Sequence, residues 1–278
     1  MKPITPIIID SWIPWPVLTI LWWIHGNEVC WVQTLDILSQ KLNIKRWKVF
    51  LMYGNLRAID TNARQIDCNL NRMFRDDATM NEFEMNSYEY LRSREIMKYL
   101  DQSIWCLDLH SSPSFGSPAL IITEEACNSI IEWFPFSRRC YGFSEMEPGW
   151  TDGYMFRNGK VGICVECWYH KDSDAFLKWL ESVKQFLSYY DMLDDISIFP
   201  SDFPKEEIRT YRAKTAYKTQ TDTFRVVKIF SDFEDIIAGQ LIWYDDFIPV
   251  YAENTGSILF ARDRNQKGVE WFVEIISA

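Results

Sequence analysis

Residues 17–28 read Val17-Leu18-Thr19-Ile20-Leu21-Trp22-Trp23-Ile24-His25-Gly26-Asn27-Glu28. The apolar run that opens this stretch predicts a buried strand of an α/β sheet. His25 and Glu28 follow where that strand ends, and open α/β sheets bind their ligands outside the carboxyl ends of their strands. An imidazole and a carboxylate three residues apart can turn toward one point there, which indicates a metal site.

A third candidate ligand, His110, follows a second apolar run at residues 104–109. Two imidazoles and one carboxylate leave a coordination position open for water, which distinguishes catalytic zinc sites from closed structural ones. The alternative is that each histidine is a hydrogen-bonded structural residue, since the pattern H-x-x-E is common by chance. The metal interpretation is favoured because the chain has only three histidines, and two of them stand at the ends of predicted strands.

A carboxylate and a polar loop accompany these residues. Glu166 lies inside an apolar run at residues 161–167, where an ionised carboxylate is unfavourable unless it is paired or used. It is therefore either the partner of a buried arginine or lysine, or a general base with a raised pKa near the metal. The loop at residues 56–77 is dense in arginine and asparagine, which predicts either a solvated surface or a wall that binds an anionic substrate.

The apolar pattern predicts an α/β domain over residues 1–195 and a small, mostly-β domain over residues 196–278. Strands are expected at 17–23, 47–53, 104–109, 119–123 and 161–167, and helices at 29–42, 82–100, 129–136 and 176–190. Pro200 and Pro204 mark a linker. Residues 209–278 carry short alternating runs of β-branched and aromatic residues, which are typical of an antiparallel sheet.

Composition narrows the classes of partner. The net charge of -10 argues against nucleic acid or an anionic membrane surface as the main partner. The N-terminal segment contains four prolines and Asp10 and lacks the pattern of a signal peptide, and no run is long enough to span a bilayer. We therefore expect a cytoplasmic protein that acts on a small molecule.

The cysteines and aromatic residues are expected to be structural. The seven cysteines are scattered, several within apolar runs, which fits reduced core thiols better than a disulfide framework. Cys164-x-x-Cys167 has the spacing of a redox or zinc pair, but no second pair accompanies it. The 13 tryptophans and 18 phenylalanines are expected in the core or in subunit contacts, so a homo-oligomer is compatible with the sequence.

Four motifs, taken in order, resemble the succinylglutamate desuccinylase and aspartoacylase family of zinc-dependent amidohydrolases. They are His25-Gly26-Asn27-Glu28, then Gly54-Asn55 followed by Arg64-Gln65-Ile66-Asp67-Cys68-Asn69-Leu70-Asn71-Arg72-Met73-Phe74, then Asp108-Leu109-His110, and then Val165-Glu166. The ordered set is far more specific than any of its parts. The resemblance implies a zinc-carboxypeptidase-like α/β/α core with a mixed sheet, and one zinc ion per chain.

The resemblance also implies roles for the residues that match. His25, Glu28 and His110 match the metal ligands. Glu166 matches the residue that takes a proton from water and passes it to the leaving amine. Arg64 matches the arginine that polarises the scissile carbonyl.

Three further residues concern the substrate. Asn71 and Arg72 match the residues that hold a substrate carboxylate, and Arg157 lies about where a second carboxylate-binding arginine is expected. These assignments predict an N-acyl amino acid as the substrate.

Some positions depart from the family pattern. Asn69 stands where an aspartate is more usual, and Trp168 follows two residues after the expected base, in a segment where a glycine is common. Aspartoacylases carry a tyrosine shortly after the residues that correspond to Glu253, but this chain continues Asn254-Thr255-Gly256. The last difference weakens the case for N-acetylaspartate as the substrate.

The predicted function is hydrolysis of a linear amide, other than a peptide bond, in an N-acyl amino acid by a zinc-dependent enzyme. Two alternatives stay open. The first is a metallocarboxypeptidase that acts on a short peptide, because the same metal centre and an arginine for the terminal carboxylate would serve it. The second is a non-catalytic ligand-binding protein on the same scaffold. The acyl group, the amino acid, the native metal and the oligomeric state are not fixed by the sequence.

Overall fold

The computed structural model describes residues 5–278 except 14, 29–31, 113–114, 170–171, 173, 202, 205–206 and 264–269. Cys30 and His170 lie outside the described residues, as does the first turn of the helix expected at 29–42. The side chain of Trp168, two residues after the expected base, also lies outside them.

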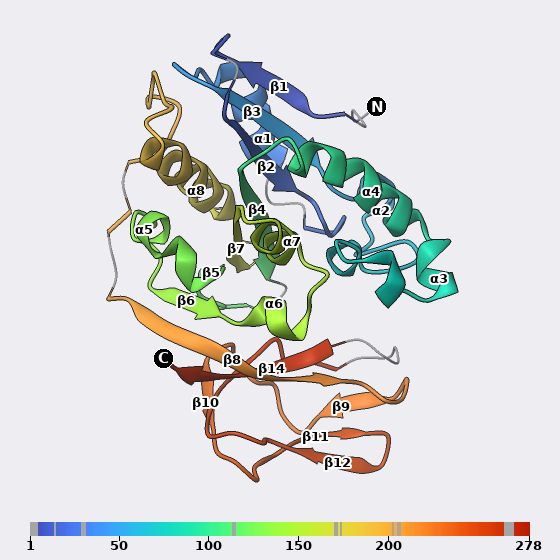
Figure 1. Ribbon diagram of the computed structural model, residues 1–278. Coiled ribbons are helices and arrows are strands. Elements are labelled where there is room, and N and C mark those ends of the chain that lie inside the picture. Colours follow the sequence, from blue (N-terminus) through green and yellow to red (C-terminus); the bar gives the residue numbers. More distant parts are fainter. Residues whose placement is uncertain are drawn as a thin grey trace.

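The described part of the chain is built on an eleven-stranded mixed sheet with the order β1-β3-β2-β4-β7-β5-β6-β8-β14-β13-β10, and on a three-stranded sheet with the order β12-β11-β9 (Figure 1). Strands β3, β2, β4 and β7 are parallel neighbours, and β5 runs antiparallel to β7. The strands are β1 (Ile7–Asp10), β2 (Val17–Trp22), β3 (Lys48–Tyr53), β4 (Trp105–Ser112), β5 (Leu120–Ile122), β6 (Arg138–Tyr141), β7 (Val161–Tyr169), β8 (Arg209–Lys218), β9 (Phe224–Val226), β10 (Glu234–Ile236), β11 (Leu241–Asp245), β12 (Ile248–Tyr251), β13 (Gly256–Leu259) and β14 (Glu270–Ser277).

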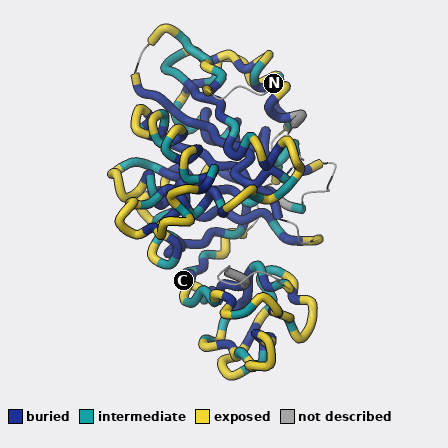
Figure 2. The backbone as a smooth tube through the Cα atoms, turned by 90° about the vertical axis from the view of Figure 1, so that its right-hand side faces the viewer, coloured by how far each residue is buried: buried dark blue, intermediate teal, exposed yellow. Residues whose placement is uncertain are grey.

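Helices cover both faces of the parallel strands. Leu18, Ile20 and Trp22 of β2 belong to a cluster that includes residues of α1, α5 and α8, whereas Val17 and Leu21 belong to a cluster that includes residues of α4 and α7. Figure 2 shows buried backbone, in dark blue, concentrated in the interior of the larger part of the molecule. The helices are α1 (Val32–Lys41), α2 (Leu56–Thr61), α3 (Glu82–Met85), α4 (Tyr88–Leu100), α5 (Asn128–Ile131), α6 (Phe143–Met146), α7 (Thr151–Arg157) and α8 (Ala175–Tyr189), with short 3-10 turns η2 (Leu70–Arg72), η3 (Asp77–Thr79) and η4 (Glu125–Cys127). The predicted α/β/α architecture with a mixed sheet is confirmed.

Several expected elements differ in length for identifiable reasons. The helix predicted at 82–100 is broken into α3 and α4, because Ser87 begins a new helix by accepting a hydrogen bond from the Tyr90 N–H. The segment expected as an irregular loop contains α2, which Asn55 caps and which buries Ala58 and Ile59. The helix predicted at 129–136 has only one turn, α5.

The region between Phe136 and Val161 lies outside the helices and strands expected from the sequence, and it contains β6, α6 and α7. The apolar spacing of this region does not predict α7, because Thr151, Asp152 and Gly153 are buried there although two of them are polar.

The C-terminal residues form antiparallel strands, as predicted. They also extend the large sheet, because β8 pairs in parallel with β6 in a register that joins Arg138 to Arg209 and Tyr141 to Arg212. Strands β14, β13 and β10 follow, each antiparallel to its neighbour. The division at residues 195 and 196 stays a prediction, but the two parts share one sheet.

Within the described residues, none of the helices combines the length and the apolar character needed to span a bilayer.

Candidate metal centre and active site

The carboxyl ends of β2 and β4 bring His25, Glu28 and His110 together. The strands are parallel neighbours in which Trp22 pairs with Leu109, so the residues that follow both positions meet at one edge of the sheet. All three side chains are buried, and their ligand atoms lie within 4.8 Å of one another. This part of the described chain could therefore hold a metal ion.

The loop that carries His25 and Glu28 packs directly against α2. A Cβ atom on Gly26 would lie 2.1 Å from the backbone carbon of Ala58, so the close approach requires a glycine. The Gly26 N–H also donates a hydrogen bond to the Arg64 carbonyl at 3.3 Å. The packing of this one glycine thus ties the loop of the candidate ligands to the segment that carries Arg64.

The two imidazole rings present equivalent nitrogens to Glu28. His25 Nδ1 lies 2.7 Å from Glu28 Oε1, and His110 Nδ1 lies 3.5 Å from Glu28 Oε2. The opposite nitrogens face outer acceptors: His25 Nε2 lies 3.0 Å from Asn69 Oδ1, and His110 Nε2 lies 3.1 Å from Asp108 Oδ2. Histidines that bind a metal are usually held in this way, with the second nitrogen on a carboxylate or carbonyl oxygen.

The donor set fits a divalent transition metal such as zinc. Two imidazoles and one carboxylate are the protein ligands of many catalytic zinc sites. Both ring nitrogens of His110 are buried, and neither makes a hydrogen bond of good geometry within the described residues. Coordination of the Nδ1 atom would satisfy one of these buried polar atoms.

The electrostatics of the cluster favour a positive charge at its centre. Burial, together with the charge of Arg64, lowers the pKa of His25 to about 3, so this imidazole is neutral. Burial acts to raise the pKa of Glu28, but His25 and His110 outweigh it and hold the pKa below its usual range. Burial acts to lower the pKa of His110, but Asp108 and Glu28 raise it well above the usual value. Either a proton or a metal ion satisfies these carboxylates, and a bound metal would displace the proton.

Glu166 lies beside this cluster on β7. It pairs with His110 in the β4–β7 ladder and lines a cavity of about 100 Å³ that also contains the three candidate ligands. Burial raises the pKa of Glu166 to about 7, and the nearby Glu28 adds to this effect, while His110 and Arg64 oppose it. A carboxylate with a pKa in this range can both accept and return a proton near neutral pH.

Three residues of the polar loop also line the cavity: Arg64, Asn71 and Arg72. Arg64 lines the cavity and keeps part of its surface exposed, while burial lowers the pKa of its guanidinium. Asn71 is buried, and its Oδ1 accepts a hydrogen bond from the Thr151 N–H at 3.3 Å. The structure thus brings these three predicted residues to the candidate metal centre.

Arg72 already has a counter-ion. Its Nε lies 3.2 Å from Glu147 Oε2, and its guanidinium lies 5.1 Å from the centre of the Trp150 ring. Lys218 Nζ reaches the other oxygen of Glu147 at 2.6 Å. A substrate carboxylate at Arg72 would therefore join an existing ion pair.

Arg157 is not brought to this cavity. It stands at the end of α7, and its Nη2 donates a hydrogen bond to the Phe74 carbonyl at 2.7 Å. It lines a separate hollow with Arg75, Asp77 and Arg94. The expected carboxylate contact of Arg157 finds no support in this arrangement, because α7 directs the side chain toward the loop after η2.

The cavity also has an apolar wall that the sequence did not reveal. Phe143 stacks on Trp150 with ring centres 5.1 Å apart, and residues from the C-terminal strands complete the wall. The wall consists of Phe143, Met146, Trp150, Ala216, Phe260 and Val273. Arg262 lines the same cavity. Burial lowers the pKa of Arg262, and the nearby Glu166 carboxylate opposes this effect. No local pattern marks Ala216, Phe260, Arg262 and Val273, because they reach the site only through the pairing of β8 with β6.

The two cysteines of the Cys164-x-x-Cys167 motif do not form a redox or zinc pair with each other. Cys164 and Cys167 belong to clusters on opposite sides of β7, as expected for positions three apart on a strand. The six cysteines within the described residues are all buried, and no disulfide joins any two of them. Their predicted place in the core is confirmed.

Replacement of Asn69 by aspartate should tighten zinc binding by about 10-fold or more, because a carboxylate is a stronger acceptor for the His25 N–H than an amide. Competition with a chromogenic chelator measures the affinity. Asn81→Asp is the matched control, since it adds the same charge at an exposed helix cap that aspartate serves equally well. Equal zinc affinity in Asn69→Asp and the unaltered protein would contradict this role for residue 69.

Comparison with known proteins gives an independent view of the chain. Residues 17–126 match the succinylglutamate desuccinylase/aspartoacylase catalytic domain. A succinylglutamate desuccinylase from Pseudoalteromonas atlantica is 32% identical over 103 residues. That match covers 32% of this chain and spans only 29% of that protein.

Solved structures resemble nearly the whole chain. Succinylglutamate desuccinylase from Vibrio parahaemolyticus has a TM-score of 0.70 at 15% identity, over 94% of this chain and 81% of that one. The product-bound ectoine utilization protein EutE from Ruegeria pomeroyi has a TM-score of 0.69 at 13% identity, over 95% and 86%. At sequence identities this low, the similarity shows a shared fold. The resemblance predicted from the motifs is therefore confirmed: residues 17–126 match the catalytic domain of the succinylglutamate desuccinylase and aspartoacylase family, and the chain has the fold of its solved structures.

Proposed function

We propose that this protein is a zinc-dependent amidohydrolase that cleaves the amide bond of an N-acyl amino acid. One observation carries the proposal. A single cavity contains a His-Glu-His group, a carboxylate whose pKa is raised to about 7, and an arginine exposed to the cavity. The family match over residues 17–126 supports a deacylase.

His25, Glu28 and His110 would hold one zinc ion per chain. The metal would supply Lewis acidity toward the amide carbonyl and would make water a nucleophile near neutral pH. Asp108 and Asn69 would keep the two rings oriented through their Nε2 atoms. Thr151 Oγ1 in turn donates a hydrogen bond to Asp108 Oδ2, so α7 supports this orientation.

The other residues divide the chemistry of hydrolysis. Glu166, when ionised, would accept a proton from the attacking water and later donate it to the leaving amine. The Arg64 guanidinium would stabilise the negative charge that develops on the carbonyl oxygen. Asn71 and Arg72 would hold the substrate carboxylate, with Glu147 fixing the orientation of Arg72.

The test is product analysis with a substrate panel. Zinc-loaded protein is incubated with N-acetyl, N-formyl and N-succinyl amino acids, including N-succinylglutamate, and with dipeptides that have a free carboxylate. We expect release of the free amino acid and the acyl carboxylate from at least one N-acyl amino acid. Cleavage of dipeptides alone would instead establish the carboxypeptidase, and zinc binding without any cleavage would favour the ligand-binding protein.

A further inference from the structure

The segment from Arg64 to Arg72 carries most of the polar residues proposed to act on the substrate. Within it, only Leu70–Arg72 forms regular structure, a single 3-10 turn. Catalytic groups must be held close to their working geometry, since displacements of about 1 Å can reduce the rate about a hundredfold. Contacts from other elements must therefore fix this segment.

Glu89 of α4 makes such contacts. It is completely buried, and its carboxylate accepts four hydrogen bonds. Oε1 accepts from the Ile66 N–H at 2.7 Å and from Asn55 Nδ2 at 2.8 Å. Oε2 accepts from the N–H groups of Asp67 and Cys68, each at 3.1 Å. Successive backbone N–H groups that converge on one point form an anion-binding concavity, and here a carboxylate of the same chain fills it.

These hydrogen bonds connect Glu89 to both candidate histidine and substrate residues. Asn69 follows Cys68 directly, and its Oδ1 lies 3.0 Å from His25 Nε2 and accepts from the Asn71 N–H at 3.0 Å. Asn55 donates its own backbone N–H to the Trp23 carbonyl at 2.7 Å, which ties the network to the end of β2. A single carboxylate thus lies between the end of β2 and the loop that orients His25.

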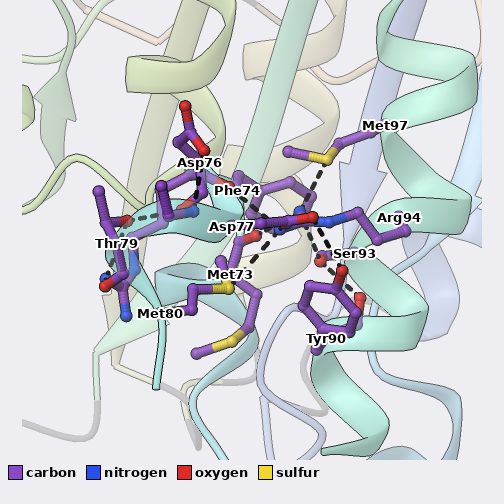
Figure 3. A network of polar contacts seen from close by, with 12 residues as sticks. Met73, Phe74, Asp76, Asp77, Thr79, Met80, Tyr90, Ser93, Arg94 and Met97 are labelled. Carbon is purple, nitrogen blue, oxygen red and sulfur yellow. Dashed lines mark hydrogen bonds and ion pairs between the residues drawn. The ribbon is translucent and has the colours of Figure 1, made fainter. Parts of the chain in front are cut away.

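The same helix also holds the far side of the loop. Figure 3 shows Arg94 of α4 pointing toward Met73 and Asp77. Its Nη1 donates to the Met73 carbonyl at 2.8 Å, and its Nη2 donates to the Arg75 carbonyl at 3.0 Å and lies 2.6 Å from Asp77 Oδ1. Helix α4 therefore directs the Glu89 carboxylate toward the backbone N–H groups before η2, and the Arg94 guanidinium toward the backbone carbonyls after η2.

We propose that Glu89 is a positioning residue of the active site: its buried carboxylate fixes residues 66–68 and thereby sets the positions of Arg64, Asn69 and Asn71. Its effect on turnover rests on the function proposed above. Its effect on the loop and on His25 does not, because both are measurable without a substrate.

The experiment compares Glu89→Gln with Glu95→Gln. Glutamine keeps the size of Glu89 but replaces one acceptor oxygen with an NH2 group that faces backbone donors. Glu95 lies on the same helix, half of its side chain is exposed, and it pairs with Arg92 rather than with the loop. Amide hydrogen exchange of the metal-free proteins, zinc affinity by chelator competition, and kcat and KM on the substrate found in the panel are measured for both variants.

In Glu89→Gln we expect amide hydrogen exchange at residues 66–68 to rise at least about 10-fold while α8 stays protected. We expect the affinity for zinc to fall about 10-fold. We also expect kcat to fall by a larger factor than KM rises. Glu95→Gln should match the unaltered protein in all three measurements. Unchanged exchange at 66–68, or a uniform rise over the whole chain, would overturn the proposal. If Glu89→Gln does not fold, Glu89→Asp carries the same test, because it retracts the carboxylate by one methylene and retains the charge. A protein without activity toward any substrate but with the expected changes in exchange and zinc affinity would refute the proposed function and support the role of Glu89.

Discussion

Replacement of Glu166 by glutamine should lower kcat on an N-acyl amino acid by about a hundred- to ten-thousandfold while one zinc ion per chain remains bound. Glutamine has nearly the shape of glutamate but cannot accept the proton of the attacking water. The side chain lines the cavity beside His110 without belonging to the His-Glu-His group, so the metal site should stay intact. Steady-state kinetics and metal analysis of the purified variant measure the two effects, and Glu166→Ala should behave in the same way.

The pH profile of the unaltered enzyme gives a second test of Glu166 as the general base. A general base must be ionised, so kcat/KM should rise with pH and level off once the carboxylate has lost its proton. The pKa of Glu166 is about 7 in the absence of a metal, because burial raises it more than His110 and Arg64 lower it. A bound cation would lower this pKa, so the midpoint of the rising limb should lie at or below about pH 7. Glu145→Gln is the control, since this exposed carboxylate lies outside the cavity. Activity of Glu166→Gln within about tenfold of the unaltered enzyme would remove Glu166 as the base.

Replacement of His110 by alanine should have the largest effect on metal binding. The variant loses one of three protein ligands and leaves Asp108 and Glu28 without the imidazole that lies between them. We expect zinc affinity to fall by more than about a hundredfold, since loss of an outer-sphere partner alone typically costs about 10- to 100-fold. Turnover should fall to the background rate at any zinc concentration that the protein tolerates.

Equilibrium dialysis followed by metal analysis measures this affinity, and circular dichroism checks that the variant is folded. Glu166→Gln is the internal comparison, because it should lose turnover but keep zinc, whereas His110→Ala should lose both. Zinc binding by His110→Ala with the affinity of the unaltered protein would show that the metal, if any, is held elsewhere.

The sequence predicted that His25, Glu28 and His110 meet because their meeting depends on the geometry of neighbouring parallel strands. His25 and His110 each follow an apolar run, and parallel strands deliver such residues to one edge of a sheet. Glu166 could be predicted for a related reason, since a carboxylate within an apolar strand requires a partner or a role. The β4–β7 ladder then places it opposite His110.

The remainder of the cavity depends on contacts that periodicity does not encode. Phe260, Arg262 and Val273 reach the site because β8 pairs with β6, and the order of strands in space cannot be read from apolar spacing. Arg157 was assigned a substrate contact from its place in the sequence alone. Apolar spacing does not predict α7, because Thr151 and Asp152 are polar, and this helix directs Arg157 toward Phe74.

Some of the missed local structure did leave a signal. Asn81 and Glu84 form a capping box at the start of α3, and Ser87 caps α4 two residues after α3 ends. These capping residues could have divided the helix expected at 82–100. The division matters for function, because the first turn of α4 places Glu89 under the loop of Arg64 and Asn69.

We propose that one zinc ion, held by His25, Glu28 and His110, is required for hydrolysis of an amide bond. The most direct measurement titrates zinc into the metal-free protein and follows release of free amine from the N-acyl amino acid that the panel identifies. We expect that activity is absent at the start, rises in proportion to the added zinc, and levels off at one equivalent per chain. Amine release that is independent of zinc, or that does not appear after one equivalent has been bound, would contradict it.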